Sequence, residues 1–318
     1  MTQAVDVMAD EVAEGFTTEV ERPPRSLTQL AWRRFRRHKM ALCGAFILSF
    51  IVLYIIIGSF IFSEAYANHT DLDLKFSAPS REHLFGTDAT GRDILARTIY
   101  GGQISMMVGV LAVFISVVVG ITVGALAGFY GGFVDSLLMR FTEAMLNIPG
   151  LFLLILAGRL FQAKIPSFTF LGRSFTGSVI LIIVIIGLTS WMYLARIVRA
   201  NFLSLKEQEF ITAARCIGVK NFGLIFRHIL PNSVAPIVVA ATLGVANAIL
   251  MEAYASYLGL GIQPPTASWG NMLDKAQHYL RTAPWLWIFP GAFILLTVLS
   301  INFLGDGLRD ALDPRTQI

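Results

Sequence analysis

Long apolar segments most limit what this chain can fold into. Five are long enough to cross a bilayer core, which takes about 20 helical residues; they lie at residues 40–62, 104–129, 177–194, 233–257 and 285–304. A sixth, at 137–161, is weaker because Arg140, Glu143 and Arg159 interrupt it, and Pro149 is expected to kink it. With 55% hydrophobic and 14% charged residues, the chain is not a soluble globular protein. The sequence predicts an all-α integral membrane protein with six transmembrane helices.

The charges that flank these segments predict the topology. Residues 1–25 show no hydrophobic periodicity, which is typical of a disordered tail. The first apolar segment begins too late and is too long for a signal peptide. A basic run at residues 33–39 follows in an amphipathic segment and abuts the first span. Such a run is far more often a topology signal than a nucleic-acid patch, so we expect both termini in the cytoplasm and no nucleic acid as a partner.

This topology divides the chain into five parts. We expect a cytoplasmic tail with a basic amphipathic helix at 1–39, a first transmembrane helix at 40–62, an extracytoplasmic loop at 63–101, a transmembrane core at 102–305 and a cytoplasmic tail at 306–318. Within the core, the polar segment 201–232 lies between two spans and falls on the cytoplasmic side.

The polar segment 201–232 is predicted to form two short helices. Ser204 followed by Glu207 fits a capping box at a helix start. An apolar face follows at helical spacing, made of Phe210, Ala213, Ala214 and Ile217. Gly218 is expected to end this helix, and Asn221 to cap a second one that Pro231 ends before the next span.

The first of these two helices is a candidate docking surface. Its alanines and its terminal glycine allow a close approach, so we expect another molecule to bind there. On spacing alone an alternative stays open, in which the segment is a connector whose amphipathic helix rests on the lipid interface.

Acidic residues elsewhere are weaker candidates for chemistry. Asp88 and Asp93 of the outer loop lack partner ligands at a metal-binding spacing, so we expect a self-contained salt-bridged loop there. Glu252 lies well inside a span, where an ionisable side chain is a candidate for a substrate pathway. Tyr254 and Tyr257 beside it indicate that the outer interface is close, so a role without substrate contact stays open.

Glycine and tryptophan residues carry predictions about packing. Gly120, Gly124 and Gly128 recur at four-residue spacing in the second span and predict a face that another helix approaches closely. The 257–273 loop is rich in glycine and proline, so we expect a tight, irregular loop with Trp269 as an anchor at the membrane interface.

Signatures of an enzyme or of other transporter classes are weak. No Gly-Lys dipeptide occurs in the sequence, which excludes a Walker A phosphate loop. The five histidines are scattered without ligand spacing, so neither a metal site nor a membrane enzyme is expected. Inverted repeats and broken helices around buried ion ligands, expected of a secondary transporter, are not evident. The two cysteines suit no disulfide.

Four separated motifs resemble a known family. The string TAARCIG followed by HILPN resembles the EAA loop of ATP-binding-cassette import permeases. The residues that match its pattern in register are Ala213, Ala214, Gly218, Leu230 and Pro231. Thr212 stands where the family usually has Glu, and His228 where it has Ile. The string HLFGTDATGRD, the 257–273 loop and the final span with its tail resemble the C-type permease of the dipeptide and oligopeptide importer family, so the resemblance covers residues 26–315.

The resemblance implies a fold, partners and a substrate class. The fold would be that of a type I import permease, with one additional span before a five-helix core. The chain would be a multi-pass subunit of the inner or plasma membrane that works with a sister permease, two ATP-binding subunits and an extracytoplasmic substrate-binding protein. ATP and Mg would be bound by those partners, so no cofactor, metal or catalytic residue is expected here. Peptides are the expected substrate, with nickel chelates, glutathione or glycosides as alternatives, and a secondary transporter is a less favoured hypothesis.

The resemblance also implies roles for individual residues. The residues expected to seat in a cleft of one ATPase subunit are Phe210, Thr212, Ala213, Ala214, Ile217 and Gly218. Pro231 and Pro236 are expected to form a hinge where the fifth span takes up the movement of the ATPase pair. The helix bundle would then rock between inward-open and outward-open states.

Overall fold

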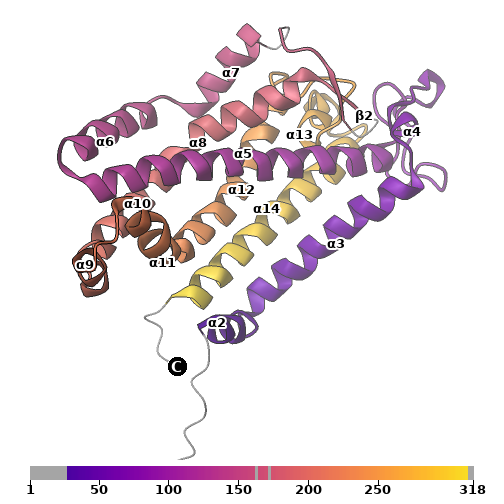
Figure 1. Ribbon diagram of the computed structural model, residues 1–318. Coiled ribbons are helices and arrows are strands. Elements are labelled where there is room, and N and C mark those ends of the chain that lie inside the picture. The colour runs from indigo at the N-terminus through magenta and orange to yellow at the C-terminus, as the bar shows by residue number, and fades with distance from the viewer. Residues whose placement is uncertain (1–26, 162–163, 171–172, 314–318) are drawn as a thin grey trace, which may run out of the picture.

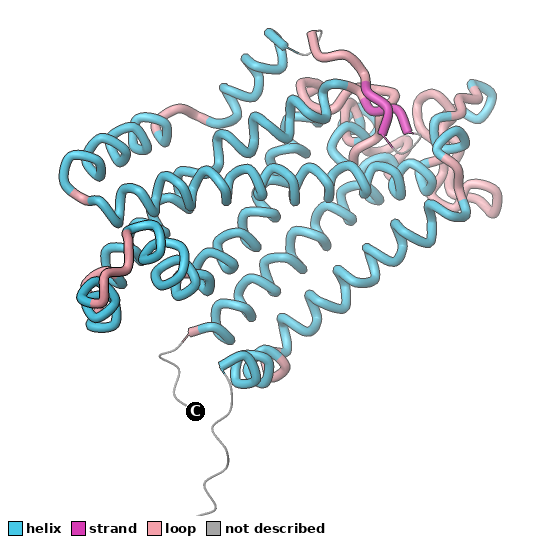
Figure 2. Tube along the Cα trace, in the orientation of Figure 1, coloured by secondary structure: helices cyan, strands magenta, loops and turns pink. Residues whose placement is uncertain are grey.

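The long helices of the structure correspond to the predicted apolar segments. The computed structural model describes residues 27–161, 164–170 and 173–313, and the predicted disordered tail lies outside them. The helices that are long and apolar enough to cross a membrane are α3 (Lys39–Ile61), α5 (Ile94–Tyr130), α8 (Gly177–Leu205), α12 (Val234–Tyr257) and α14 (Trp285–Leu312). They form one bundle (Figure 1), and the loops collect at its ends (Figure 2).

Short elements connect the long helices at the two ends of the bundle. At one end lie α2 (Leu27–Phe35), α9 (Glu209–Cys216), α10 (Asn221–Gly223), the π-helical η2 (Leu224–Ile229) and α11 (Leu230–Asn232). At the other end lie α4 (Glu64–Asn68), η1 (Leu72–Leu74), an antiparallel hairpin of β1 (Phe168–Phe170) and β2 (Arg173–Phe175), α13 (Trp269–Met272) and η3 (Ala276–Tyr279). We call these the α9 end and the α4 end.

The last turn of α14 also lies at the α9 end. Arg34 Nη1 of α2 donates a hydrogen bond to the carbonyl oxygen of Asp313 at 2.7 Å. His38, whose Nδ1 caps the start of α3, places its Nε2 3.4 Å from a carboxylate oxygen of Asp310. The basic segment before the first span and the carboxyl-terminal end of the last span therefore contact each other, as an even number of crossings requires.

The kink that the sequence predicts at Pro149 in the 137–161 segment is confirmed, and it is sharp enough to break the helix. The segment forms α6 (Gly132–Leu146) and α7 (Gly150–Phe161), which meet at an angle of 76°. The break includes Pro149, which has no N–H to continue the helical hydrogen bonds. The described residues thus contain five candidate spans, or six if the bent pair is one span.

Three long helices extend well beyond the predicted segments: α5 begins earlier, α8 ends later, and α14 continues to Leu312 instead of ending at residue 304. α5 begins at Ile94 rather than at residue 104, because Asp93 caps it by accepting a hydrogen bond from the amide of Ala96 at 2.8 Å. Its 37 residues span about 55 Å, well beyond a hydrocarbon core of about 30 Å. The first turns of α5 and the last turns of α8 contain polar residues, so the apolar segments of the sequence did not include them. In the structure both pack against other parts of the protein.

The glycine face of α5 packs closely on α8, as predicted. A Cβ atom built on Gly124 would lie 2.5 Å from the carbonyl oxygen of Ala195. At Gly128 it would lie 2.6 Å from the Cβ of Phe202, and at Gly120 3.0 Å from side-chain atoms of Leu194. Larger side chains at these positions would separate the two helices, whose contact is the most extensive in the bundle.

Candidate functional site

The polar segment between α8 and α12 folds against the α9 end of the bundle. Ile211, with 0% of its surface exposed, and Ala214 turn inward from α9. They belong to one hydrophobic cluster with Phe129 of α5 and with Val198 and Phe202 of α8. α9 is therefore packed against both long helices.

Gly218 ends α9, as the sequence predicts. Its φ of +84° lies in the left-handed region that favours glycine. The amide of Val219 donates to the carbonyl of Ala214 at 3.1 Å, and the amide of Gly218 donates to the carbonyl of Arg215 at 3.0 Å. This pair of bonds is a Schellman motif, which satisfies the last carbonyls of the helix.

The predicted start of α9 is wrong. Ser204 lies in the last turn of α8, and α9 begins only at Glu209. Gln208 occupies the position before the first turn and makes no side-chain capping bond. α8 continues through Ser204 because its neighbour Phe202 is fully buried in the cluster beneath α9, and this tertiary contact outweighs the local capping signal.

The opposite side of α9 faces outward. The predicted coupling residues that are exposed on it are Phe210, Thr212, Ala213 and Ile217. Ile217 is 82% exposed, and a Cβ atom built on Gly218 would meet nothing within 4 Å. Ala214 alone among the predicted coupling residues is buried. Five of the six predicted coupling residues are therefore exposed.

Two further aromatic residues are exposed in the same polar segment and were missed from the sequence. Phe222 and Phe226 are 73% and 51% exposed, and their ring centroids lie 4.4 Å apart. Their spacing of four residues between Lys220 and Arg227 was the available signal, because exposed aromatic pairs beside basic residues are unusual outside binding surfaces. We call Phe210, Ile217, Phe222 and Phe226 together the apolar patch.

The second helix differs from its prediction. Lys220, not Asn221, precedes α10, and no side chain caps it. Pro231 does not end the helix, since it lies within α11, directly after the π-helical turns of η2. Pro236 lies in the first turn of α12, where a missing N–H costs no hydrogen bond. A hinge role for the two prolines stays a prediction. Ser233, with φ −96° and ψ 0°, separates α11 from α12.

Glu252 is fully buried between α5, α12 and the loop after α12. Its carboxylate accepts hydrogen bonds from the hydroxyl groups of Ser105 at 2.9 Å and Ser256 at 2.7 Å. Those hydroxyls in turn accept the amides of Trp269 at 3.2 Å and Ile262 at 3.0 Å. Glu252 therefore ties the outer loop to two spanning helices, and its contact with a substrate pathway stays a prediction.

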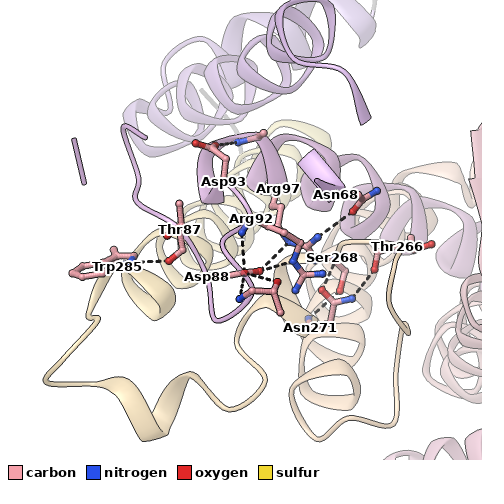
Figure 3. Close-up of polar contacts among 12 residues, drawn as sticks. Asn68, Thr87, Asp88, Arg92, Asp93, Arg97, Thr266, Ser268, Asn271 and Trp285 are labelled. Carbon is pink, nitrogen blue, oxygen red and sulfur yellow. Dashed lines mark hydrogen bonds and ion pairs between the residues drawn. The ribbon is translucent and has the colours of Figure 1, made fainter. Parts of the chain in front are cut away.

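The outer motif forms a salt-bridged loop, as predicted (Figure 3). The Asp88 carboxylate accepts from Arg92 Nε at 2.7 Å and from the amide and hydroxyl of Thr90 at 2.7 and 2.8 Å, and Arg97 Nε lies 3.9 Å away. Burial by itself raises the pKa of the Asp88 carboxyl, but the two guanidinium groups and the Thr90 hydrogen bonds outweigh burial and lower that pKa below its ordinary value. The charged form is thus the stable one.

This loop joins the starts of α5 and α14. Trp285, the first residue of α14, donates its indole N–H to the carbonyl of Thr87 at 3.1 Å (Figure 3). Gly86 has a φ of +73°, and a Cβ atom there would lie 2.9 Å from the same indole nitrogen. His83 Nδ1 lies 2.8 Å from the carboxylate of Asp93, which caps α5. The motif is therefore a structural clamp at the α4 end.

Trp269 is not the interfacial anchor that the sequence predicts. It is fully buried, its indole N–H donates to the carbonyl of Thr98 at 2.8 Å, and its ring stacks on Phe293. A capping box between Ser268 and Asn271 holds the short helix that carries it. The indole N–H is hydrogen-bonded within the protein, so Trp269 can be buried without lying at the membrane–water interface, and α13 packs into the bundle.

The architecture defines the class of protein. A chain of the MetNI methionine ABC transporter, solved in inward-facing conformations, superposes with a TM-score of 0.53 at 18% identity, covering 67% of this chain and 94% of that chain. The fold is that of a type I ABC importer permease.

Comparisons of sequence give the family. Residues 120–318 match the family described as binding-protein-dependent transport system inner membrane component, and residues 26–79 match the N-terminal TM domain of oligopeptide transport permease C. The oligopeptide transport system permease protein OppC of Escherichia coli (strain K12) is 45% identical over 96% of this chain and 97% of its own length. OppC of Haemophilus influenzae is 42% identical over 98% of this chain and 94% of its own length. The chain belongs to the binding-protein-dependent permease family and is a multi-pass protein of the inner membrane.

Proposed function

We propose that this chain is the non-catalytic transmembrane subunit of an ATP-driven peptide importer and that α9 is its contact with an ATPase subunit. The observation that carries the proposal is the two-sided nature of α9, which is anchored through Ile211 and exposes Phe210 and Ile217. An exposed apolar patch of this kind on a polar end segment is typical of a protein interface. The α9 end is then cytoplasmic, and the α4 end faces the substrate-binding protein.

The contacts around α9 supply a route for mechanical coupling. Closure of the ATPase pair on ATP and Mg pulls α9, and the cluster around Ile211 transmits the pull to α5 and α8. Arg199 of α8 forms a bidentate pair with Asp135 of α6, at 2.5 and 2.6 Å, so α6 moves with them. Energy enters through contacts that differ between the nucleotide states, and this chain supplies no catalytic group.

The residue types exposed on α9 favour an apolar contact with the ATPase subunit over an ion pair. Thr212 stands where the related permeases usually have Glu, so no carboxylate is available at this position. Docking then depends on apolar burial by Phe210 and Ile217, with Phe222 and Phe226 at its edge. Such an interface is expected to be less sensitive to salt than one based on an ion pair.

Peptides are the proposed substrate, because the proteins that are 42–45% identical over nearly the whole chain carry the name of an oligopeptide permease. Nickel chelates, glutathione and glycosides are the alternatives. Uptake of a labelled tripeptide into proteoliposomes that contain the sister permease, two ATPase subunits and the binding protein distinguishes among them. ATP-dependent uptake supports the proposal, whereas uptake driven by an ion gradient without ATP would indicate a secondary transporter.

Gly218 and Gly259 provide a matched test of the α9 contact. Both have a positive φ, +84° and +72°, and open space where a Cβ atom would lie. Asparagine tolerates this conformation, so Gly218→Asn keeps the turn and adds a side chain only to the outer surface. We expect Gly218→Asn to lower the affinity for the ATPase subunits and to stop transport, and Gly259→Asn at the α4 end to leave that affinity unchanged. Equal ATPase affinities for wild type and Gly218→Asn would contradict the proposal.

A further inference from the structure

A groove lined by apolar side chains with a few polar ones among them follows α5, α8 and α12 between the two ends of the bundle. It consists of two cavities of about 480 and 410 Å³ that share Tyr193, Ala240 and Leu243. Ser116, Ser190 and Asn247 line the larger cavity. The smaller cavity continues along Asn201 and Pro236 toward the α9 end, where Arg309 and Asp313 line its mouth. We call the two cavities together the groove.

The groove exposes polar groups without partners. The side chains of Ser190, Tyr193 and Asn247 are exposed, Tyr193 to 69%. Within the described part of the chain, none of the three makes a side-chain hydrogen bond. By contrast, the Thr242 hydroxyl, on another face of α12, bonds to its own helix at the carbonyl of Val238, 2.9 Å away. Ser190, Tyr193 and Asn247 thus lack a hydrogen bond to a carbonyl of their own helix, which is how a hydroxyl group such as that of Thr242 is satisfied in lipid.

The depth of these residues makes contact with lipid unfavourable. Ser190 lies about 20 Å along α8 from its start at Gly177, and Asn247 lies about 20 Å along α12 from its start at Val234. Both positions are inside the hydrocarbon core of a bilayer. Polar side chains at this depth face a partner helix or a water-filled cavity. In the assembled protein the groove is therefore expected to face a partner helix or water and not lipid.

The chemistry of the groove indicates what passes along it. Among its described lining residues, charged side chains occur only at the mouth near the α9 end. The polar groups in the middle of the groove are hydroxyl and carboxamide groups, set among apolar side chains such as Val113 and Leu243. Such groups both donate and accept hydrogen bonds. They match the N–H and C=O groups that every peptide repeats, whatever side chains it carries.

We propose that Ser190, Tyr193 and Asn247 form this chain's half of the translocation pathway and bind the main chain of the peptide as it passes. The inference rests on the proposed function, because peptides are the substrate and a sister permease closes the groove. Selection by side chain then takes place outside the membrane, since no charged group here favours one sequence. The pathway thereby accepts acidic, basic and neutral peptides alike.

Thiol labelling tests whether the groove is solvated. Cysteine is introduced one position at a time as Ser190→Cys, Asn247→Cys or Thr242→Cys in a chain with Cys43→Ser and Cys216→Ser, and the complex is assembled with its sister permease and ATPase subunits in nanodiscs. A charged methanethiosulfonate reacts with the thiolate, which forms only where water reaches it, so we expect at least about tenfold faster labelling at 190 and 247 than at 242. Labelling at 242 that is as fast as in the groove would overturn the inference.

Transport by variants tests recognition of the main chain. Asn247→Leu keeps the size of the side chain and removes its hydrogen bonds, and Thr242→Val is the matched control on another face of α12. Loss of one hydrogen bond is expected to lower uptake about fivefold, and by the same factor for trialanine, trilysine and triglutamate. A loss confined to one of these peptides, or an equal loss with Thr242→Val, would refute main-chain recognition.

The two experiments separate the possible failures. If the wild-type assembly imports no tripeptide at all, the peptide substrate is wrong and main-chain recognition fails with it. The labelling pattern does not depend on the substrate, so it decides by itself whether the groove is a solvated pathway. Slow labelling at all three positions would show that lipid or a helix covers the groove, and would overturn the pathway assignment even if peptides are imported.

Discussion

Two isoleucines on opposite sides of α9 give the sharpest test of how this permease is driven. Ile211 is 0% exposed and Ile217 is 82% exposed, so the same substitution removes the same atoms from different surroundings. Ile217→Ala should change the free energy of unfolding by less than about 0.5 kcal/mol. Ile211→Ala leaves a cavity beneath α9 and should cost about 3 kcal/mol.

For the affinity for the ATPase subunit, the order should be reversed: Ile217→Ala should have the larger direct effect. If the ATPase cleft covers Ile217 fully, alanine removes three buried carbon groups at about 0.8 kcal/mol each, or about 2 kcal/mol. That loss corresponds to an affinity for the ATPase subunit that is weaker by about thirtyfold. Ile217→Ala should therefore assemble a stable bundle that binds its ATPase poorly, whereas Ile211→Ala should yield an unstable bundle.

The assay combines two measurements on the same detergent-solubilised permease pair. Thermal unfolding reports stability, and titration with a fluorescent ATPase subunit reports affinity. The reasoning is refuted if Ile217→Ala binds the ATPase as tightly as wild type, because the exposed side of α9 would then not be the interface. It is equally refuted if Ile211→Ala leaves the unfolding temperature unchanged, since α9 would then be unanchored.

Four further substitutions, at three residues, test the half of the protein at the α4 end. Asp88→Asn should lower the stability of the folded 63–93 loop by on the order of 3 kcal/mol, because Arg92 loses its charge partner. Faster proteolysis of this loop would measure the effect. Because the pKa of Asp88 is lowered on folding, its stabilisation is complete above about pH 4 and is lost as the pH falls through the depressed value; a wild-type loop whose protection ends above pH 5 would contradict this. Glu252→Gln should keep the loop bonded and transport intact, whereas Glu252→Leu should lower the unfolding temperature by stranding buried hydroxyls at about 1–3 kcal/mol. Trp269→Phe should lower the free energy of unfolding by about 2 kcal/mol, because it leaves a void and removes the indole hydrogen bond to the Thr98 carbonyl; an unchanged unfolding temperature would refute that contact.

The coupling segment shows how far local sequence can predict this site. Gly218 was predictable, because a glycine after an amphipathic stretch marks a helix end and the required φ is positive. The start of α9 was not, since the capping pattern at Ser204 competes with the burial of Phe202, which depends on residues far away in the chain. Local helix propensities differ by a few tenths of a kcal/mol per residue, which is less than the free energy gained by burying one aromatic side chain.

The sequence by itself determined that this chain crosses a membrane, that its ends and its coupling segment lie at one side, and that α5 carries a close-packing face. Those properties follow from length, charge and spacing along one segment. Only the tertiary structure decided that Ile211 is covered while Ile217 is open, that Trp269 enters the bundle, and that Ser190 and Asn247 share one groove. Such facts depend on which helices become neighbours, and no single segment contains that information.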